Sequence, residues 1–243
     1  MIYKSLEEKI KEYKNKHMLE KLKKLESLLT LGEKKYYEDF DITPYKNSLE
    51  PGSMPADGLY EQWISFLKPN VVIEVGSFLG YSAIKMAKEV KRLGLPTKII
   101  CVDTWLGSPE HYRMYKSKED IRIGYKNGYP TLYQKFITSV IENDVQDIIQ
   151  PFPYPSSIAY KILNNIFTEL DIKADFIFLD GSHEELDVQM DLYYYYQLLN
   201  EGGELWGDDY GWEGVNKAIH TFCNENKIYC VVQPNNVHWT IKK

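Results

Sequence analysis

The sequence predicts an α/β fold in which a doubly wound, mostly parallel sheet follows an N-terminal helical extension. From Val71 onward, short apolar runs alternate with segments of helical spacing, as in a chain of βαβ units. These runs are hydrophobic at nearly every position, which is typical of strands buried on both faces. The length of 243 residues suits one α/β domain plus an extra element and is enough to bury a continuous core.

Residues 1–37 form the predicted extension, and residues 38–243 the main domain. The extension contains ten lysines and six glutamates, a formal charge of +4, which leaves −10 for the rest. Its apolar residues follow helical spacing in two sets, with a one-residue slip between them: Leu6, Ile10 and Tyr13, then Met18, Leu22, Leu25 and Leu29. Such a narrow stripe needs a partner, which is either the main domain or a second chain. Because the stripe is long enough to pair with a second copy, we expect a homodimer. Gly32 is expected to end the helix.

The remaining elements follow in order along the main domain. A loop rich in Pro, Gly and Ser (41–58) precedes a helix from about Leu59 to Leu67. Strands are then predicted at 71–76, 98–103, 147–152, 174–180 and 202–209, and helices at 82–93, 132–143, 157–170, 185–199 and 215–225. Residues 107–130 are polar and aromatic, as in an insertion or lid. The chain closes with an expected antiparallel pair at 228–234 and 236–243.

Composition argues against several classes of protein. With a net charge of −6, the chain lacks a global basic footprint for nucleic acid. No apolar run approaches 18 residues, and the N-terminus has no apolar signal core, so neither membrane binding nor secretion is expected. Three cysteines outside any C-x-x-C pair indicate a reduced, cytoplasmic protein. The 20 tyrosines, including 193–196, are interpreted mainly as packing, with an aromatic-rimmed site as the alternative.

The first candidate site lies where two predicted strands end. Gly76 and Gly80 follow the first strand and allow a sharp turn against which a ligand can lie. Because they are four residues apart and no third glycine follows, a nicotinamide dinucleotide is disfavoured. Glu74 would repel a phosphate but suits an ammonium group, and Asp103 can accept hydrogen bonds from both hydroxyls of a ribose. The pattern favours an adenosyl amino acid; a generic glycine turn with a solvated aspartate is the alternative.

A second group of polar residues follows two later strands. Asp180 and His183 end one strand, and Asp208 with Asp209 ends the next. Clustered carboxylates repel one another unless a cation neutralises them, and oxygen ligands suit Mg²⁺. The near-neutral pKa of an imidazole suits a general base for a hydroxyl. The alternatives are helix capping by the two aspartates and a surface or supporting role for the histidine.

Other chemistry has little support in the sequence. The remaining histidines (His17, His111, His220 and His238) have no metal-ligand spacing, and His111, in the insertion, is the first to reconsider. Neither G-x-S-x-G nor G-x-x-x-x-G-K-[ST] occurs, so a hydrolase elbow and a P-loop are unsupported.

Four ordered segments resemble a known family. EVGSFLGYSAIKMA is similar to the cofactor loop of class I S-adenosylmethionine (SAM)-dependent methyltransferases, particularly the catechol-type O-methyltransferases. CVDTWLGS, FLDGSH and GGELWGDDYGWEGVNKAI resemble the macrolide-sugar O-methyltransferases. The resemblance spans about residues 54–222. It implies a seven-stranded Rossmann-like methyltransferase fold with an antiparallel C-terminal strand.

The resemblance also implies roles for individual residues. Glu74, Gly76, Ser77, Gly80 and Ser82 are assigned to the methionine part of SAM, and Asp180 is also expected to bind the cofactor. Asp103 is assigned to the ribose, Trp105 to a position beside the adenine, and Ser156 and Ser157 to the adenine edge. Thr104 is assigned to cofactor binding in general. Asp180, Asp208 and Asp209 are the implied Mg²⁺ ligands. His183, as the implied general base, and Asp180 are the expected catalytic residues.

The resulting hypothesis is metal-assisted O-methylation of a small, polar, hydroxylated acceptor such as a sugar or polyphenol. The aromatic residues that could wall the acceptor site are Tyr125, Tyr129, Tyr154, Tyr210, Trp105, Trp206 and Trp212. One alternative is a non-catalytic subunit that binds an adenosyl ligand or serves in assembly. A second alternative is a hydroxylase-like relative of the same fold.

Overall fold

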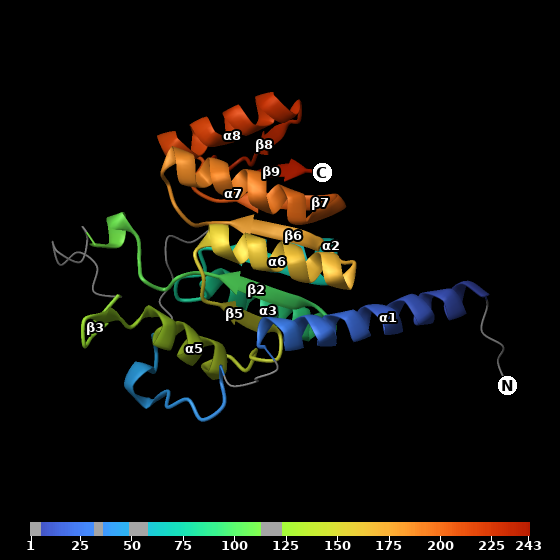
Figure 1. Ribbon diagram of the computed structural model, residues 1–243, viewed down its shortest axis with the longest axis horizontal. Coiled ribbons are helices and arrows are strands. Elements are labelled where there is room, and N and C mark those ends of the chain that lie inside the picture. Colours follow the sequence, from blue (N-terminus) through green and yellow to red (C-terminus); the bar gives the residue numbers. More distant parts are fainter. Residues whose placement is uncertain (1–5, 32–35, 49–57, 113–122) are drawn as a thin grey trace.

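The computed structural model describes residues 6–31, 36–48, 58–112 and 123–243, and its centre is a seven-stranded sheet (Figure 1). The strands are β1 (Val71–Val75), β2 (Lys98–Val102), β5 (Ile149–Phe152), β6 (Ala174–Leu179), β7 (Leu199–Gly207), β8 (Cys230–Val232) and β9 (Trp239–Lys242). Their order is β5-β2-β1-β6-β7-β9-β8, and β9 runs antiparallel to both of its neighbours. This confirms the predicted fold class, including the antiparallel C-terminal strand.

Helices cover both faces of the sheet. They are α1 (Leu6–Leu29), α2 (Leu59–Leu67), α3 (Tyr81–Leu93), α5 (Leu132–Glu142), α6 (Ser156–Leu170), α7 (Glu185–Leu198) and α8 (Glu213–Asn226). α1, α6, α7 and α8 lie on the face nearer the viewer in Figure 1, and α2, α3 and α5 pack on the other. A short hairpin of β3 (Tyr125–Lys126) and β4 (Tyr129–Pro130) and a 3₁₀ turn (Thr43–Tyr45) lie outside these layers.

The near-continuous hydrophobicity of the strands follows from this two-sided cover. All five residues of β1 are buried. Ile73 and Val75 belong to the core beneath α6 and α7, whereas Val72 belongs to the core beneath α2 and α3. Alternate side chains therefore enter two separate cores, so each position of the strand favours an apolar residue.

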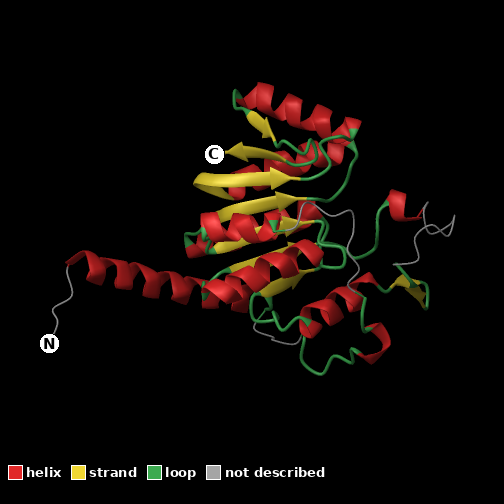
Figure 2. Cartoon of the chain, turned by 180° about the vertical axis from the view of Figure 1, so that it is seen from behind, coloured by secondary structure: helices red, strands yellow, loops and turns green. Residues whose placement is uncertain are grey.

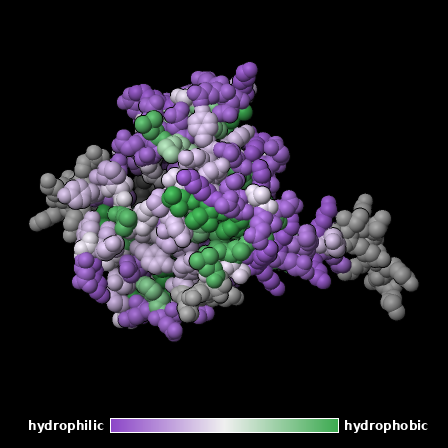
Figure 3. Space-filling view, in the orientation of Figure 1, coloured by the Kyte–Doolittle hydropathy of each residue, from purple (hydrophilic) through white to green (hydrophobic). Residues whose placement is uncertain are grey.

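The second half of α1 packs against the main domain. Leu22, Leu25 and Leu29 are at most 5% exposed and join the core beneath α6, while Tyr13 is 72% exposed. The first half of the helix projects past the sheet, as Figure 2 shows from behind, and its surface is largely hydrophilic (Figure 3). The main domain is thus the partner of the second set of apolar residues.

Some predictions fall outside the described residues or need adjustment. Gly32, residues 49–57 of the predicted loop, residues 113–122 of the insertion and the side chains of Leu6 and Ile10 lie outside the described part. Within the insertion, Ile123 is only 1% exposed, so part of this segment belongs to the core rather than to a lid. Tyr195 is fully buried and its three tyrosine neighbours pack against the same core, which confirms packing as the role of that run.

A search of the described helices for a membrane-spanning segment finds none with sufficient length and hydropathy.

Candidate functional site

The polar residues predicted at strand ends meet at the carboxyl edge of the sheet. Backbone hydrogen bonds of the sheet continue one residue past the strands and hold this edge. The four bonds run from Gly76 N to Val102 O (2.9 Å), Asp180 N to Val75 O (2.8 Å), Asp208 N to Leu179 O (3.1 Å) and Asp103 N to Phe152 O (3.4 Å). The strand order reverses at β1, so these residues flank the topological switch point, where open α/β sheets bind their ligands.

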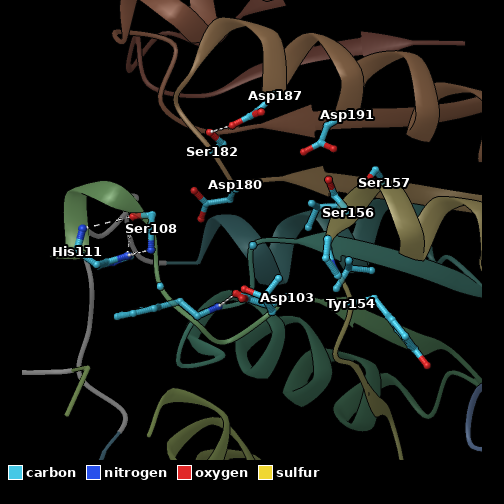
Figure 4. Close-up of a pocket in the computed structure, with 18 of the residues that line it drawn as sticks. Asp103, Ser108, His111, Tyr154, Ser156, Ser157, Asp180, Ser182, Asp187 and Asp191 are labelled. Carbon is cyan, nitrogen blue, oxygen red and sulfur yellow. Dashed lines mark hydrogen bonds between the residues drawn. The ribbon is translucent and has the colours of Figure 1, made fainter. Parts of the chain in front are cut away.

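A cavity of about 420 Å³ opens at this edge, within the usual size range for a small-molecule site. Figure 4 shows Asp103 and Asp180 near its middle, Ser108 and His111 towards one end, and Tyr154, Ser156, Ser157 and Asp191 towards the other. Two further residues that the sequence predicted for the cofactor site, Thr104 and Gly76, also line this cavity. A second cavity of about 210 Å³ adjoins it and is lined by Ser77, Ser82, His183, Asp208 and Asp209, among others.

Gly76 is required by the close approach of two loops. It has a φ of 91°, and a Cβ atom at this position would lie 2.0 Å from the carbonyl oxygen of Asp180. Any other residue would push the β1 and β6 loops apart. Gly80 also has a positive φ and begins α3, where its Cβ position lies 3.0 Å from the Phe136 ring, but Gly80 lines neither cavity.

Asp103 is fixed by the backbone on either side of it. Its Oδ2 accepts a hydrogen bond from the N–H of Phe78 (2.8 Å), and its Oδ1 accepts one from the N–H of Trp105 (2.7 Å). Burial raises the pKa of Asp103, while these hydrogen bonds act to lower it. Each carboxylate oxygen retains a lone pair that can accept a hydrogen bond from a ligand in the cavity.

Glu74 corrects one sequence-based assignment. Its side chain is completely buried and lines neither cavity. The hydroxyl of Ser82 donates to Glu74 Oε1 at 2.5 Å, and Sγ of Cys101 lies 3.7 Å from Oε2. Burial raises the pKa of Glu74 to about 7. The carboxyl therefore lies beneath the glycine turn and supports it, because the pleat directs this side chain towards α3 and away from the ligand side.

Trp105 is a second correction, because its indole does not face the cavity. The residue has a φ of 53° and is only 2% exposed. Its Nε1 donates to the carbonyl oxygen of Phe78 (2.8 Å), and its ring packs against Phe136 and Tyr133. The left-handed backbone turns the side chain into the core, and Trp105 lines neither cavity, so its predicted place beside the adenine is wrong.

Three carboxylates converge beside the second cavity. One oxygen from each of Asp180, Asp208 and Asp209 lies within 4.8 Å of the others. Burial raises the pKa of Asp180 well above its ordinary range, and repulsion from Asp208 and Asp209 raises it further. Oxygen donors this close can share one hard cation, which would remove the repulsion, so the residues present fit a divalent metal.

His183 adjoins this cluster. Its Nε2 lies 2.8 Å from Oδ2 of Asp209, and its ring stacks on Trp212 with centroids 4.4 Å apart. The hydrogen bond to Asp209 raises the pKa of His183. Among the aromatic residues proposed for the acceptor site, Trp212 is therefore beside the cluster and Tyr154 lines the first cavity, whereas Trp206 packs on Trp63 in the core.

Sequence reasoning missed three residues of this region. His111 lines both cavities and stacks on Phe78, with ring centroids 4.7 Å apart. The fully buried His238 places its Nε2 3.5 Å from Oδ1 of Asp208. Asp191, in the middle of α7, lines the first cavity. His111 was marked by its place in the insertion, but no local pattern distinguishes His238 or Asp191.

The fold and the site together define a class I SAM-dependent methyltransferase. The defining features are the doubly wound sheet with this strand order, the glycine turn after β1, the acid after β2 and the further acids after β6 and β7. The chain belongs to the methyltransferase-domain family, whose sequence pattern matches residues 73–210, more than half of its length.

Solved structures share the fold. The O-methyltransferase from Bacillus cereus in complex with SAH is 13% identical, with a TM-score of 0.51 over 93% of this chain and 90% of that one. The O-methyltransferase TomG from Streptomyces achromogenes, in complex with SAM, is 12% identical, with a TM-score of 0.55 over 86% and 89%. The O-methyltransferase NovP is 10% identical, with a TM-score of 0.57 over 91% and 97%. No curated protein sequence matches the chain significantly.

Proposed function

We propose that this protein is a metal-assisted O-methyltransferase that transfers the methyl group of SAM to a hydroxyl of a small, polar acceptor. The observation that carries the proposal is the acidic cluster of Asp180, Asp208 and Asp209 with His183 beside it, next to a cavity bounded by Asp103 and Gly76. One cavity can hold the methyl donor, and the adjoining one offers the groups that a hydroxyl acceptor needs.

The first cavity supports binding of an adenosyl amino acid. Asp103 has both oxygens directed by backbone N–H groups, and it offers acceptors for the two hydroxyls of a ribose. Gly76 lets the ligand lie against the backbone between β1 and β6. SAM supplies a methyl group on a positively charged sulfur, and an acidic cavity attracts such a cation.

The cluster of three carboxylates would hold a divalent cation such as Mg²⁺. When bound, the cation lowers the pKa of an acceptor hydroxyl and orients it. Asp180 lines both cavities, so the ligand oxygens stand at the boundary between the donor and the acceptor. This position is consistent with bringing the acceptor oxygen near the methyl group.

His183 would take up the proton of the acceptor hydroxyl. Its imidazole lines the second cavity beside the carboxylates, and Asp209 and Trp212 hold the ring from two sides. The proton moves to the imidazole as the oxygen forms its new bond to the methyl carbon. The departing thioether is neutral, so the chain needs no general acid for the leaving group.

The acceptor is expected to be small, because the second cavity measures only about 210 Å³. A panel of sugars and catechols, with labelled SAM and Mg²⁺, tests the proposal by label transfer to the acceptor. Transfer to a hydroxyl that stops in excess chelator supports it. Binding of SAH without transfer to any member of a broad panel would favour the non-catalytic alternative.

A further inference from the structure

Asp191 is a buried carboxyl that the proposed chemistry does not use. It lies on α7, is 8% exposed and lines the first cavity. Its Oδ1 is buried and has no hydrogen-bond partner among the described residues. Burial raises the pKa of Asp191 to about 7, whereas a hydrogen bond with the Ser156 hydroxyl acts to lower that pKa. A buried acceptor without a partner is costly, so a ligand that supplies a donor would remove an existing penalty.

The position of this carboxyl is held from both sides. The hydroxyl of Tyr195, one helical turn further along α7, donates to the carbonyl oxygen of Ser156 (3.0 Å) and ties α7 to the start of α6. At the start of α7, the hydroxyl of Ser182 donates to Oδ2 of Asp187 (2.8 Å). Asp191 therefore presents its oxygen from a rigid helix rather than from a loop.

Packing alone gives no reason for an acid here. Val188 and Leu192, the neighbours of Asp191 on the buried side of α7, belong to the hydrophobic core. An apolar residue would fill the same space without burying a carboxyl oxygen. The cavity beside Asp191 gives a reason for the acid, because a carboxylate can accept a hydrogen bond from a ligand there and a leucine cannot.

The order of groups along the cavity indicates what would reach Asp191. Asp103 lies near the middle, and Asp191 lies with Ser156 and Ser157 towards the end away from Ser108 (Figure 4). A nucleoside whose ribose hydroxyls bind Asp103, and whose amino-acid part lies along Gly76, directs its base towards that end. An exposed edge of adenine carries an amino group, which is a hydrogen-bond donor.

We propose that Asp191 recognises the base of the bound nucleoside by accepting a hydrogen bond from the exocyclic amino group of adenine. This inference rests on the proposed function, since it takes the ligand to be SAM or SAH. Hypoxanthine carries a carbonyl oxygen in place of that amino group. Above about pH 8 the Asp191 carboxyl is ionised and can only accept, so an acceptor would then face an acceptor and the site should reject inosyl ligands.

Calorimetric titration with SAH and with S-inosylhomocysteine tests this. The wild-type chain is expected to bind SAH at least about ten-fold more tightly than the inosyl analogue. Asp191→Asn has the same shape and can turn its amide to donate to the carbonyl oxygen, so the preference should largely disappear. Asp191→Leu should weaken SAH binding and also remove the preference.

Two control variants separate this inference from the proposed function. Glu185→Gln removes the same charge from an exposed position of α7 and should leave both affinities unchanged. Asp103→Ala should weaken both ligands about equally and keep their ratio. A wild-type ratio in both Asp191 variants would overturn the inference alone, whereas a wild-type protein that binds neither ligand would overturn the proposed function with it.

Discussion

The Nε2 atom of His183 lies 2.8 Å from Oδ2 of Asp209, so the proposed base and a proposed metal ligand are hydrogen-bonded to each other. The stacked Trp212 ring holds the imidazole from its face. His183→Asn should lower kcat by about 10²-fold or more, because it removes the proposed proton acceptor, while SAH affinity stays unchanged. Steady-state kinetics and calorimetry measure the two effects.

The exposed His220 provides the matched control for that experiment, since it lines neither cavity. His220→Asn should leave kcat unchanged. A His183→Asn enzyme with near-normal kcat would remove the histidine from the mechanism.

Asp208→Asn should reduce the affinity for Mg²⁺ and abolish turnover. The substitution takes one charge from the cluster of three oxygens that lie within 4.8 Å of one another. Calorimetric titration with Mg²⁺ measures the binding without any acceptor. Glu213→Gln, which removes an exposed charge a few residues away, should change neither property. Full activity of the wild-type enzyme in excess chelator would contradict the metal proposal.

His238 should tune the metal site through Asp208. Asn235 accepts backbone hydrogen bonds with its Oδ1, so its Nδ2 donates to Nδ1 of His238 (2.7 Å). The ring hydrogen must then be on Nε2, which faces Asp208 Oδ1 at 3.5 Å. His238→Phe should lower the Mg²⁺ affinity about 10–100-fold, as is typical for a group that orients a ligand. His238→Gln keeps a donor and should retain most of the affinity; equal losses in the two variants would indicate a packing role only.

Glu74 makes the stability of the protein depend on pH. Burial raises its pKa to about 7 from the ordinary value of 4.5, so between these values the folded chain binds more protons than the unfolded chain. The free energy of unfolding therefore falls as pH rises from about 4.5 to about 7. Glu74→Gln removes this dependence and should gain on the order of 2–3 kcal/mol relative to wild type between pH 5 and pH 8. Urea unfolding at both pH values measures the gain, and parallel stability curves would contradict it.

The first half of α1, which projects past the sheet, is the proposed dimer contact. Removing residues 1–16 spares Leu22, Leu25 and Leu29, which belong to the core, so the truncated chain should still fold. Light scattering should show a dimer for the full chain and a monomer for the truncated chain. Unchanged molecularity would place the dimer contact elsewhere or exclude it.

The sequence predicted the carboxyl edge of the sheet well, because parallel strands all end on the same side. Asp103, Asp180 and Asp208 each follow an apolar run, and that fact alone brings them together. The direction of a side chain was harder to predict. The positive φ of Trp105 turns its ring into the core, and the pleat of β1 directs Glu74 beneath the glycine turn.

The places of His238 and Asp191 in the site could not be predicted from the sequence, for a different reason. Each acts across the fold on a group distant in the chain: His238 faces Asp208, and Asp191 lies beside Ser156. Helical or strand spacing identifies which residues are buried on one element, but it contains no information on what lies opposite them.

The sheet hydrogen bonds that continue into Gly76, Asp103, Asp180 and Asp208 have a further consequence. We expect the backbone of the site to open together with the sheet, because exposing these four amides to solvent requires separating core strands. Their hydrogen exchange should therefore be governed by unfolding of the whole domain. A ligand meets a backbone already in place, and little of its binding energy is consumed in ordering the protein.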